Sequence, residues 1–351
     1  MQRLRASPHD REIVRLAVPT LGALAAEPLY VLADTAIVGH LGTAQLASLA
    51  IAAAVMSTAF TVFNFLTYGT TAQVARLHGA RRAHEAAHVG AQAQWLALFL
   101  GVVLLAAIAA LADPLAALMG GEGEVAGGAV TYLRIAALGA PAFMLASAGQ
   151  GFLRGVGDLT TPLVILVAAH AANVVLELLF VYGFDWGLAG SAWGTVIAQL
   201  GMGAALLAVQ LRAGWQRPVV ARMRVLMRVG SEIAVRTSAL LGAFLVASAV
   251  LARIGAASLG AHQIAFQLFI FLALSLDALA IAAQVMVGRM LGAGDAAGAR
   301  AAAGRIIAWS TAVGAAFGVV LLALGDVIPR LFTGATRSSR RRTRSGGCPP
   351  R

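Results

Sequence analysis

The segment that decides the fold reads EPLYVLAD at residues 27–34, inside a longer apolar run. Its last residue, Asp34, is a carboxylate in a helix-length apolar stretch. A charge there costs roughly 2.5 kcal/mol or more in a bilayer, so it usually faces a protein interior or a path used by an ion or substrate. Glu27, Tyr30 and Asp34 are spaced i, i+3 and i+7 and share one helix face. The segment predicts a membrane helix with a functional polar face.

The composition of the whole chain agrees with this interpretation. Of its 351 residues, 60% are hydrophobic and only 12% are charged, which is too apolar for a soluble fold of this length. A stretch of about 18 or more apolar residues is long enough to span a bilayer as a helix. The sequence therefore predicts an all-α polytopic membrane protein with nine such stretches, at 14–38, 46–70, 92–112, 130–152, 161–183, 187–209, 232–252, 259–288 and 305–325.

Arginines occupy alternate loops between these stretches. The N-terminal segment and loops two, four, six and eight carry Arg3, Arg5, Arg11, Arg76, Arg81, Arg82, Arg154, Arg212, Arg217, Arg222, Arg224, Arg228, Arg289 and Arg300. Loops one, three and five carry none, and loop seven carries only Arg253. This alternation predicts a multi-pass protein of the cytoplasmic (plasma) membrane with a cytoplasmic N-terminus. The net charge of +11 is thus assigned mostly to loops facing the cytoplasm, and nucleic-acid binding is not expected because, outside the C-terminal tail, the basic residues do not gather on one face.

The chain contains an internal repeat. Residues 15–121 align without a gap onto 228–334 at a constant offset of 213. The first half has six predicted spans, an even number, so both copies start on the same side of the membrane. The sequence therefore predicts two parallel six-helix repeats, related by an axis along the membrane normal. The informative pairs are Arg15/Arg228, Gly42/Gly255, Leu46/Leu259, Ile51/Ile264, Arg76/Arg289, Gly79/Gly292, Gly101/Gly314 and Asp113/Asp326.

The second copy is shorter than the first. The match ends at Gly334, after three spans, and residues 337–351 hold six Arg and no acidic residue. We expect an N-terminal lobe of six helices at 1–213, a partial C-terminal lobe of three helices at 214–334, and an Arg-rich tail at 335–351 that is not native to the repeat. Loss of repeat, hydrophobicity and charge alternation together predicts a frameshift, an internal break or a truncated gene model. A genuine short variant with a basic tail is the alternative.

Polar residues from two further spans fall at the depth of Asp34. Asn173 and Glu177 are an i, i+4 pair in the fifth span, and Ser191 and Thr195 are another in the sixth. Counting about 1.5 Å per residue from the span ends puts Asp34, Glu177 and Thr195 at one level of the outer half of the bilayer. The three helices can therefore bring these side chains together.

This set of groups suits an ion site. Burial disfavours a charged carboxyl, and a second carboxylate adds to the effect, so one of the two acids can hold a proton near neutral pH. Tyr30, Asn173 and Thr195 can hydrogen-bond either protonation state. The set predicts a site for H⁺, or for a small oxygen-liganded cation such as Na⁺. The alternative is a satisfied polar network that joins helices, which is the expected role of Ser191, and of Thr195 when it is taken alone.

Two other polar positions are candidates for contact with a central cavity. Asp277 lies in the eighth span and aligns with Asn64 of the first copy. Matched polar positions predict that both face a cavity or the opposite lobe. An ion pair between Asp277 and Arg236 is the alternative.

An enzyme-class alternative comes from the motif HEAAH at residues 84–88. His-Glu-x-x-His is the zinc-binding helix pattern of metalloproteases. The motif is short, lies in an arginine-rich loop and lacks an evident third ligand. No metal site is therefore predicted, and the protein is expected not to be an enzyme.

Three motifs together resemble one transporter family. They are PLYVLADTAIVGHLG at 28–42, GFLRGVGDLTTP at 151–162, and DALAIA at 277–282 followed by VGR at 287–289 and GAGD at 292–295. They are similar to signatures of the multidrug and toxic compound extrusion (MATE) family, DinF-like branch. The resemblance covers residues 10–334 and implies a twelve-helix, two-lobed exporter that is truncated here in its C-terminal lobe.

The resemblance implies a function and a set of site residues. Members move cationic or amphipathic organic compounds out of the cell against H⁺ or Na⁺, with no cofactor. The family's ion-coupling pattern matches Tyr30, Asp34, Asn173 and Thr195, whereas Glu177 stands where many members have Asp. Glu27 is a possible further cavity residue, and Pro28 is a kink site in the first helix. The alternatives are a lipid or glycolipid flippase of related fold and a non-transporting remnant.

Overall fold

The computed structural model describes residues 8–254 and 256–323, without the side chains of residues 8, 229, 241, 245, 248–249 and 251–265. The predicted Arg-rich tail at 335–351 lies outside this part of the chain. So do Gly255 and Asp326, and the side chains of Arg253, Leu259 and Ile264.

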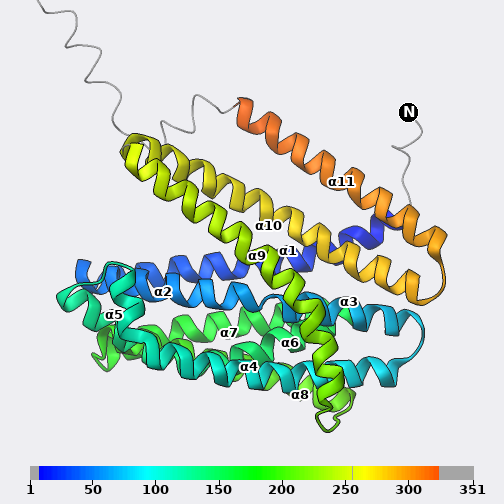
Figure 1. Ribbon diagram of the computed structural model, residues 1–351, viewed down its shortest axis with the longest axis horizontal. Coiled ribbons are helices and arrows are strands. Elements are labelled where there is room, and N and C mark those ends of the chain that lie inside the picture. The colour runs from blue at the N-terminus through cyan, green and yellow to red at the C-terminus, as the bar shows by residue number, and fades with distance from the viewer. Residues whose placement is uncertain (1–7, 255, 324–351) are drawn as a thin grey trace, which may run out of the picture.

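Every regular element in the described residues is a helix (Figure 1). The elements are α1 (Pro8–Gly39), α2 (Thr43–Phe63), α3 (Phe65–Gly79), α4 (Ala83–Leu118), α5 (Gly123–Ala136), η2 (Ala137–Gly139), α6 (Ala140–Val156), α7 (Thr160–Leu178), η3 (Leu179–Gly183), α8 (Gly187–Ala213), α9 (Val220–Ile254), α10 (Ala256–Gly292) and α11 (Ala296–Ala323). The predicted all-α fold is confirmed.

Eight segments of the described chain are long and apolar enough to cross a membrane. They correspond to eight of the nine predicted spans, and the remaining prediction, 232–252, falls within α9. Two spans are compound. α2 and α3 are separated by Asn64 alone, and α5 continues through the short 3₁₀ segment η2 into α6. Pro141, in the first turn of α6, lacks the backbone N–H that would continue the α5 hydrogen-bond ladder.

Small residues set the spacing of the helices in the α1–α8 group. A Cβ at Gly101 of α4 would lie 2.5 Å from Pro141 Cα of α6, and a Cβ at Gly203 of α8 would lie 2.5 Å from the Ala142 carbonyl oxygen. Both distances are too short for a real side-chain carbon, so only glycine allows these backbones to approach. Close backbone packing of this kind holds membrane helices together, because lipid gives no hydrophobic drive for their association.

The helices form two groups, α1–α8 and α9–α11 (Figure 1). We call the end at which α1 begins the proximal end, and the end at which α1 finishes the distal end. In Figure 1 the distal end is at the left, and there α9 and α10 diverge from the α1–α8 group. At the proximal end, α10 comes back against α3.

The proximal contact between α3 and α10 is reciprocal. A Cβ at Gly79 would lie 1.9 Å from the Arg289 carbonyl oxygen, and a Cβ at Gly292 would lie 1.9 Å from the Arg76 carbonyl oxygen. Gly79 and Gly292, like Arg76 and Arg289, are partners in the offset-213 alignment. The same patch is thus used on both helices, as in a contact across a two-fold axis.

Polar contacts surround this glycine contact. Glu12 of α1 pairs with Arg289 of α10. Asp10 accepts hydrogen bonds from Arg305 Nε and Nη2 at 2.6 and 2.7 Å and from Trp309 Nε1 at 2.9 Å, which ties α1 to α11. Together with the glycines, these residues join the two helix groups at the proximal end.

Candidate functional site: a polar cavity in the α1–α8 group

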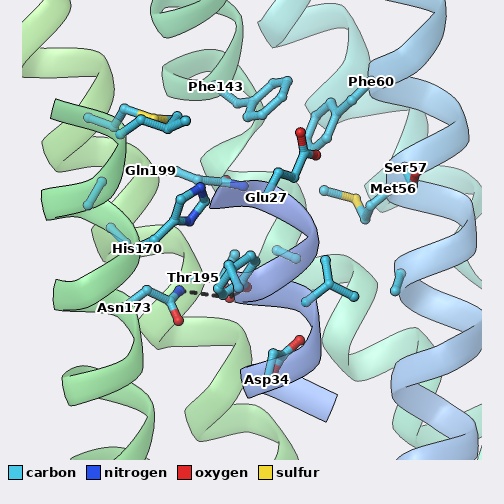
Figure 2. A pocket seen from close by; sticks show the side chains of 18 of the residues that line it. Glu27, Asp34, Met56, Ser57, Phe60, Phe143, His170, Asn173, Thr195 and Gln199 are labelled. Carbon is cyan, nitrogen blue, oxygen red and sulfur yellow. Dashed lines mark hydrogen bonds between the residues drawn. The ribbon is translucent and has the colours of Figure 1, made fainter. Parts of the chain in front are cut away.

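A cavity of about 410 Å³ lies within the α1–α8 group. Among the described residues its walls come from α1–α3 and α5–α8, and no residue of α9–α11 lines it. The size falls in the range of cavities that hold drug-sized ligands. Figure 2 shows side chains from both ends of this cavity, with Asp34 at one end and Glu27 with Phe60 at the other.

The Ser191 hydroxyl connects the two predicted carboxyl groups. Its oxygen lies 2.8 Å from Asp34 Oδ1 and 3.1 Å from Glu177 Oε1. A hydroxyl carries one proton, so it donates to one of the two oxygens at a time. All three side chains are buried, with Glu177 and Ser191 at 0% exposure and Asp34 at 6%. α1, α7 and α8 thus meet at one small polar centre.

The other three predicted residues complete this centre. Tyr30 Oη lies 3.0 Å from Thr195 Oγ1, and Asn173 Nδ2 donates to the same oxygen at 3.2 Å (Figure 2). With its amide turned over, Asn173 instead donates to Glu177 Oε1 at 3.1 Å and accepts from Thr195 N at 3.1 Å and from Thr195 Oγ1 at 3.2 Å. The turned orientation pairs every amide atom with a complementary group. Asn173 then links the Tyr30–Thr195 pair to the carboxyl pair.

Two features of local structure put Glu177 in position. Gly190 and Gly194 of α8 form a small-xxx-small pattern, and a Cβ at Gly194 would lie 3.1 Å from Glu177 Cγ. Directly after α7, residues Leu179–Gly183 form a π-helical turn, a distortion that often occurs at functional sites. Tyr182 in this turn donates to the Ile37 carbonyl at 2.6 Å and so connects it to α1.

The centre holds two carboxyl groups and no cationic side chain that pairs with them among the described residues. None of the described residues forms an ion pair with Asp34 or Glu177, and Glu177 Oε2 is buried without a hydrogen-bond partner. Two bare carboxylates this close would repel each other strongly at low dielectric. The arrangement therefore favours one bound proton or a bound cation.

The structure brings together all five residues predicted for ion coupling: Tyr30, Asp34, Asn173, Glu177 and Thr195. It also changes the interpretation of Ser191, which was expected only to join helices but contacts both carboxyls. Sequence reasoning missed Tyr132, a buried lining residue from α5, and His170, whose ring stacks on Tyr30 at 4.8 Å. The spacing of His170, one turn before Asn173, is the signal that could have found it.

Of the remaining predicted cavity residues, two line the cavity and one does not. Glu27 and Asn64 line the cavity, and Asn64 does so at the break between α2 and α3. Asp277 is not among the lining residues; it accepts a hydrogen bond from Tyr68 Oη of α3 at 2.8 Å and thereby joins the two helix groups. The alternative ion pair with Arg236 is not among the ion pairs of the described residues. Pro28 lies inside α1, together with a second proline, Pro19, that was not singled out.

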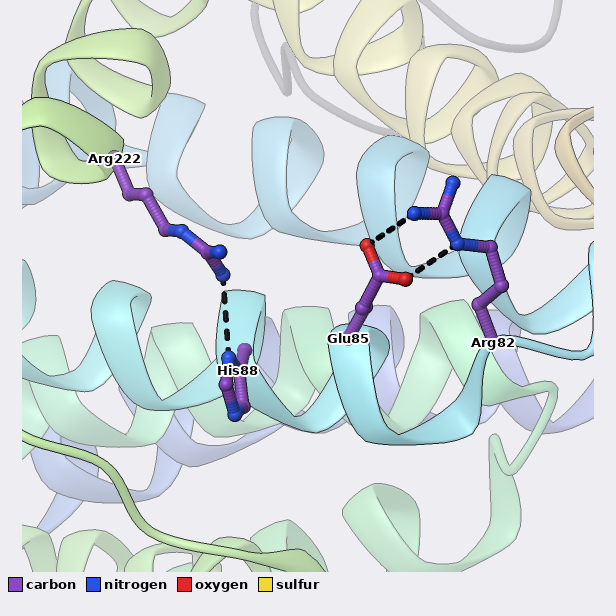
Figure 3. Close-up of polar contacts among 4 residues, drawn as sticks. All are labelled: Arg82, Glu85, His88 and Arg222. Atoms are coloured by element: carbon purple, nitrogen blue, oxygen red, sulfur yellow. Dashed lines mark hydrogen bonds and ion pairs between the residues drawn. The ribbon is translucent and has the colours of Figure 1, made fainter.

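The His-Glu-x-x-His motif has other partners in the structure (Figure 3). Glu85 binds Arg82 in two hydrogen bonds, at 2.5 and 2.7 Å, and His88 Nδ1 lies 3.2 Å from Arg222 Nη1 of α9. Among the side chains that the structure describes, no group of three or more His, Cys, Asp or Glu residues could hold a metal ion. The motif is thus an arginine-rich contact between α4 and α9.

Comparison with known proteins identifies the family. Residues 19–179 and 233–340 match the MatE family. The chain is 30% identical to Protein DETOXIFICATION 44, chloroplastic, of Arabidopsis thaliana, over 92% of this chain and 65% of that protein. It is 28% identical to DNA damage-inducible protein F of Escherichia coli (strain K12), over 93% of this chain and 74% of that protein.

Solved structures agree on the fold. A crystal structure of MATE in the bent conformation superimposes with a TM-score of 0.86 at 23% identity, over 93% of this chain and 75% of that one. The chain thus has the MATE fold. The chain belongs to the MatE family, the multidrug and toxic compound extrusion transporters, which are not enzymes.

Proposed function

We propose that this chain is the ion-coupled part of a DinF-like antiporter, which exports cationic or amphipathic organic compounds across the cytoplasmic membrane against H⁺ or Na⁺. The observation that carries the proposal is the Asp34–Ser191–Glu177 centre in the wall of a drug-sized cavity. The multidrug resistance proteins among its relatives support the substrate class. The likeness to DNA damage-inducible protein F supports the branch.

The electrostatics of the centre explain how an ion can drive export. A proton or Na⁺ entering between Asp34 and Glu177 cancels one negative charge in a cavity of low dielectric. A cationic compound in the same cavity then loses attraction to the wall and is released. The Ser191 hydroxyl can turn towards whichever carboxyl is charged, and Asn173, Tyr30 and Thr195 support both states.

Movement of α1 provides a route from ion binding to a change of conformation. Asp34 and Tyr30 lie on α1, and Pro19 and Pro28 each remove a backbone hydrogen bond from this helix. In our proposal Pro28 is a kink site through which a change at Asp34 alters the cavity. The arginine distribution supports a cytoplasmic N-terminus, so the proximal end faces the cytoplasm and the diverging distal end faces outwards.

The test is efflux by Asp34→Asn in proteoliposomes that contain this chain. We expect the wild-type chain to move ethidium against an imposed pH or Na⁺ gradient, and Asp34→Asn to lose this ion-driven flux while folding normally. Asp113→Asn is a matched control, because Asp113 is an exposed helix carboxylate paired with Arg134 outside the cavity. Imposing one gradient at a time separates H⁺ from Na⁺.

Retained ion-driven flux in Asp34→Asn would refute the assignment of the coupling site. A lipid flippase would move a labelled lipid and show no ion-coupled ethidium flux at all.

A further inference from the structure

Glu27 is a second cavity carboxylate, separate from the coupling centre. It lies seven residues before Asp34 on the same face of α1, which is about 10 Å along the helix. In Figure 2 its carboxylate points away from Asp34 and towards Phe60. No hydrogen bond or ion pair joins Glu27 to another described residue. An unpaired carboxylate in a largely apolar membrane cavity is costly unless a proton or a cation accompanies it.

Aromatic side chains flank Glu27 on two sides. On one side, Phe60 of α2 stacks on Phe143 of α6 with ring centroids 4.0 Å apart and an interplanar angle of 18°. On the other, His170 of α7 stacks on Tyr30 at 4.8 Å and 14°. Figure 2 shows Glu27 between His170 and Phe60, with Met56 beside it. Flat walls with a carboxylate between them suit a planar aromatic cation, which gains both stacking and charge attraction.

Of the groups that could neutralise Glu27, the cavity arginine is engaged elsewhere, whereas His170 Nε2 is buried without a hydrogen-bond partner. Arg154 is the one arginine among the described lining residues; it is buried and donates to Gln150 at 3.1 Å. The polar side chains of the coupling centre bond to one another and to Asp34 and Glu177. The free carboxylate at Glu27 is therefore open to a ligand, whereas that of Asp34 is held by Ser191.

We propose that Glu27, with Phe60 and Phe143, forms a subsite that selects the positively charged aromatic part of the transported compound, while Asp34 and Glu177 hold the coupling ion. This inference rests on the proposed function and assigns the two tasks to different carboxylates. Charge preference is then a property of Glu27, and ion dependence is a property of Asp34.

The experiment compares two dyes on the purified chain in nanodiscs. Ethidium is a monocation with a planar ring system, and N-phenyl-1-naphthylamine is an aromatic compound that is neutral at pH 7. We expect Glu27→Gln to weaken ethidium binding about tenfold, since the carboxylate attraction is lost, and to change binding of the neutral dye less than about twofold. Phe60→Leu should weaken binding of both dyes. Glu27→Asp, which keeps the charge, should retain part of the preference for ethidium.

Controls keep this test separate from that of the coupling site. Glu122→Gln removes an exposed carboxylate outside the cavity and should leave both dyes unaffected. Asp34→Asn should still bind ethidium while losing ion-driven flux, so failure of that variant bears on the proposed function and not on Glu27. Equal weakening of both dyes by Glu27→Gln, no weakening of either, or no saturable ethidium binding to the wild-type chain would overturn the subsite.

Discussion

The polar centre around Asp34 and the α3–α10 contact differ in the groups that form them. The centre is made of hydroxyl, amide and carboxyl groups that bond within α1, α7 and α8. The α3–α10 contact is made of two glycines whose neighbours are backbone carbonyls. The first can change its protonation state by exchanging hydrogen-bond partners, whereas the second must open if the two helix groups separate.

This difference assigns separate tasks to the two regions. The hydrogen-bonded centre can respond to a bound ion, since each donor can change its partner at small cost. The glycine contact between backbones can switch between two arrangements, since packed interfaces are either closed or open. In the proposed antiporter, ion binding at the first region has to shift the balance at the second.

Gly292→Leu should have the largest effect, because its side chain would start 1.9 Å from the Arg76 carbonyl oxygen. We expect loss of roughly 3 kcal/mol or more of unfolding free energy, or an opened α3–α10 contact, since backbone atoms must move. Chemical unfolding in mild detergent measures the loss. Gly304→Leu on α11 is the control, because nothing lies within 4 Å of a Cβ there. Equal losses in both variants would show that the α3–α10 contact does not contribute specifically to the free energy of unfolding.

Ser191→Ala tests the other side of the comparison. Removing the hydroxyl leaves Asp34 and Glu177 without their shared donor, and we expect a loss of about 1–3 kcal/mol of unfolding free energy at neutral pH. The ion dependence of efflux should shift, because the two carboxyls then interact directly. Ser57→Ala, which also removes a cavity-lining hydroxyl, should do neither. An unshifted ion dependence in Ser191→Ala would remove Ser191 from the coupling centre.

Gly194→Ala sharpens the role of packing at the polar centre. Its Cβ would lie 3.1 Å from Glu177 Cγ, so α7 and α8 must give way by a few tenths of an ångström. Both Gly194→Ala and Gly201→Ala gain about 1 kcal/mol from the better helix propensity of alanine. The difference between the two variants therefore reports the strain at Gly194. We therefore expect Gly194→Ala to be about 1–2 kcal/mol less stable than Gly201→Ala, an open position on the same helix. The thermal unfolding of the two variants in nanodiscs makes the comparison, and identical stability would contradict it.

Asp10→Asn should give the smallest effect. The variant loses the charge that Arg305 contacts at 2.6 and 2.7 Å, at a partly exposed position. We expect a slight fall in Tm that shrinks as salt is added, because salt screens the wild-type pair. Asp113→Asn, at a more exposed pair, should fall less still. A salt-independent loss would indicate a packing role for Asp10.

Much of the site could be predicted because helix periodicity is local. Asp34 with Tyr30, and Asn173 with Glu177, share faces by spacing alone, and counting along each span put them at one depth. The contact of Ser191 with both carboxyls could not be predicted, because its spacing shows only a face, whereas its partners depend on the rotation of α8 against α7. That rotation is set by Gly190 and Gly194, whose close contacts no sequence pattern measures. For Asp277 the sequence left open whether it faces the cavity or the opposite lobe, because depth alone does not tell which neighbour a side chain meets; its partner is Tyr68 of the opposite helix group.

The sequence by itself determined that this is a helical membrane protein, which residues lie at which depth, and that residues 213 apart are equivalent. Periodicity, apolar length and charge alternation carry that information, since each is a property of neighbouring residues along the chain. Only the tertiary structure decided that Ser191 stands between two carboxyls, that Glu27 faces an aromatic wall, and that equivalent residues of α3 and α10 touch each other. Those facts depend on how helices rotate and pack, and long-range packing leaves no local pattern in the sequence.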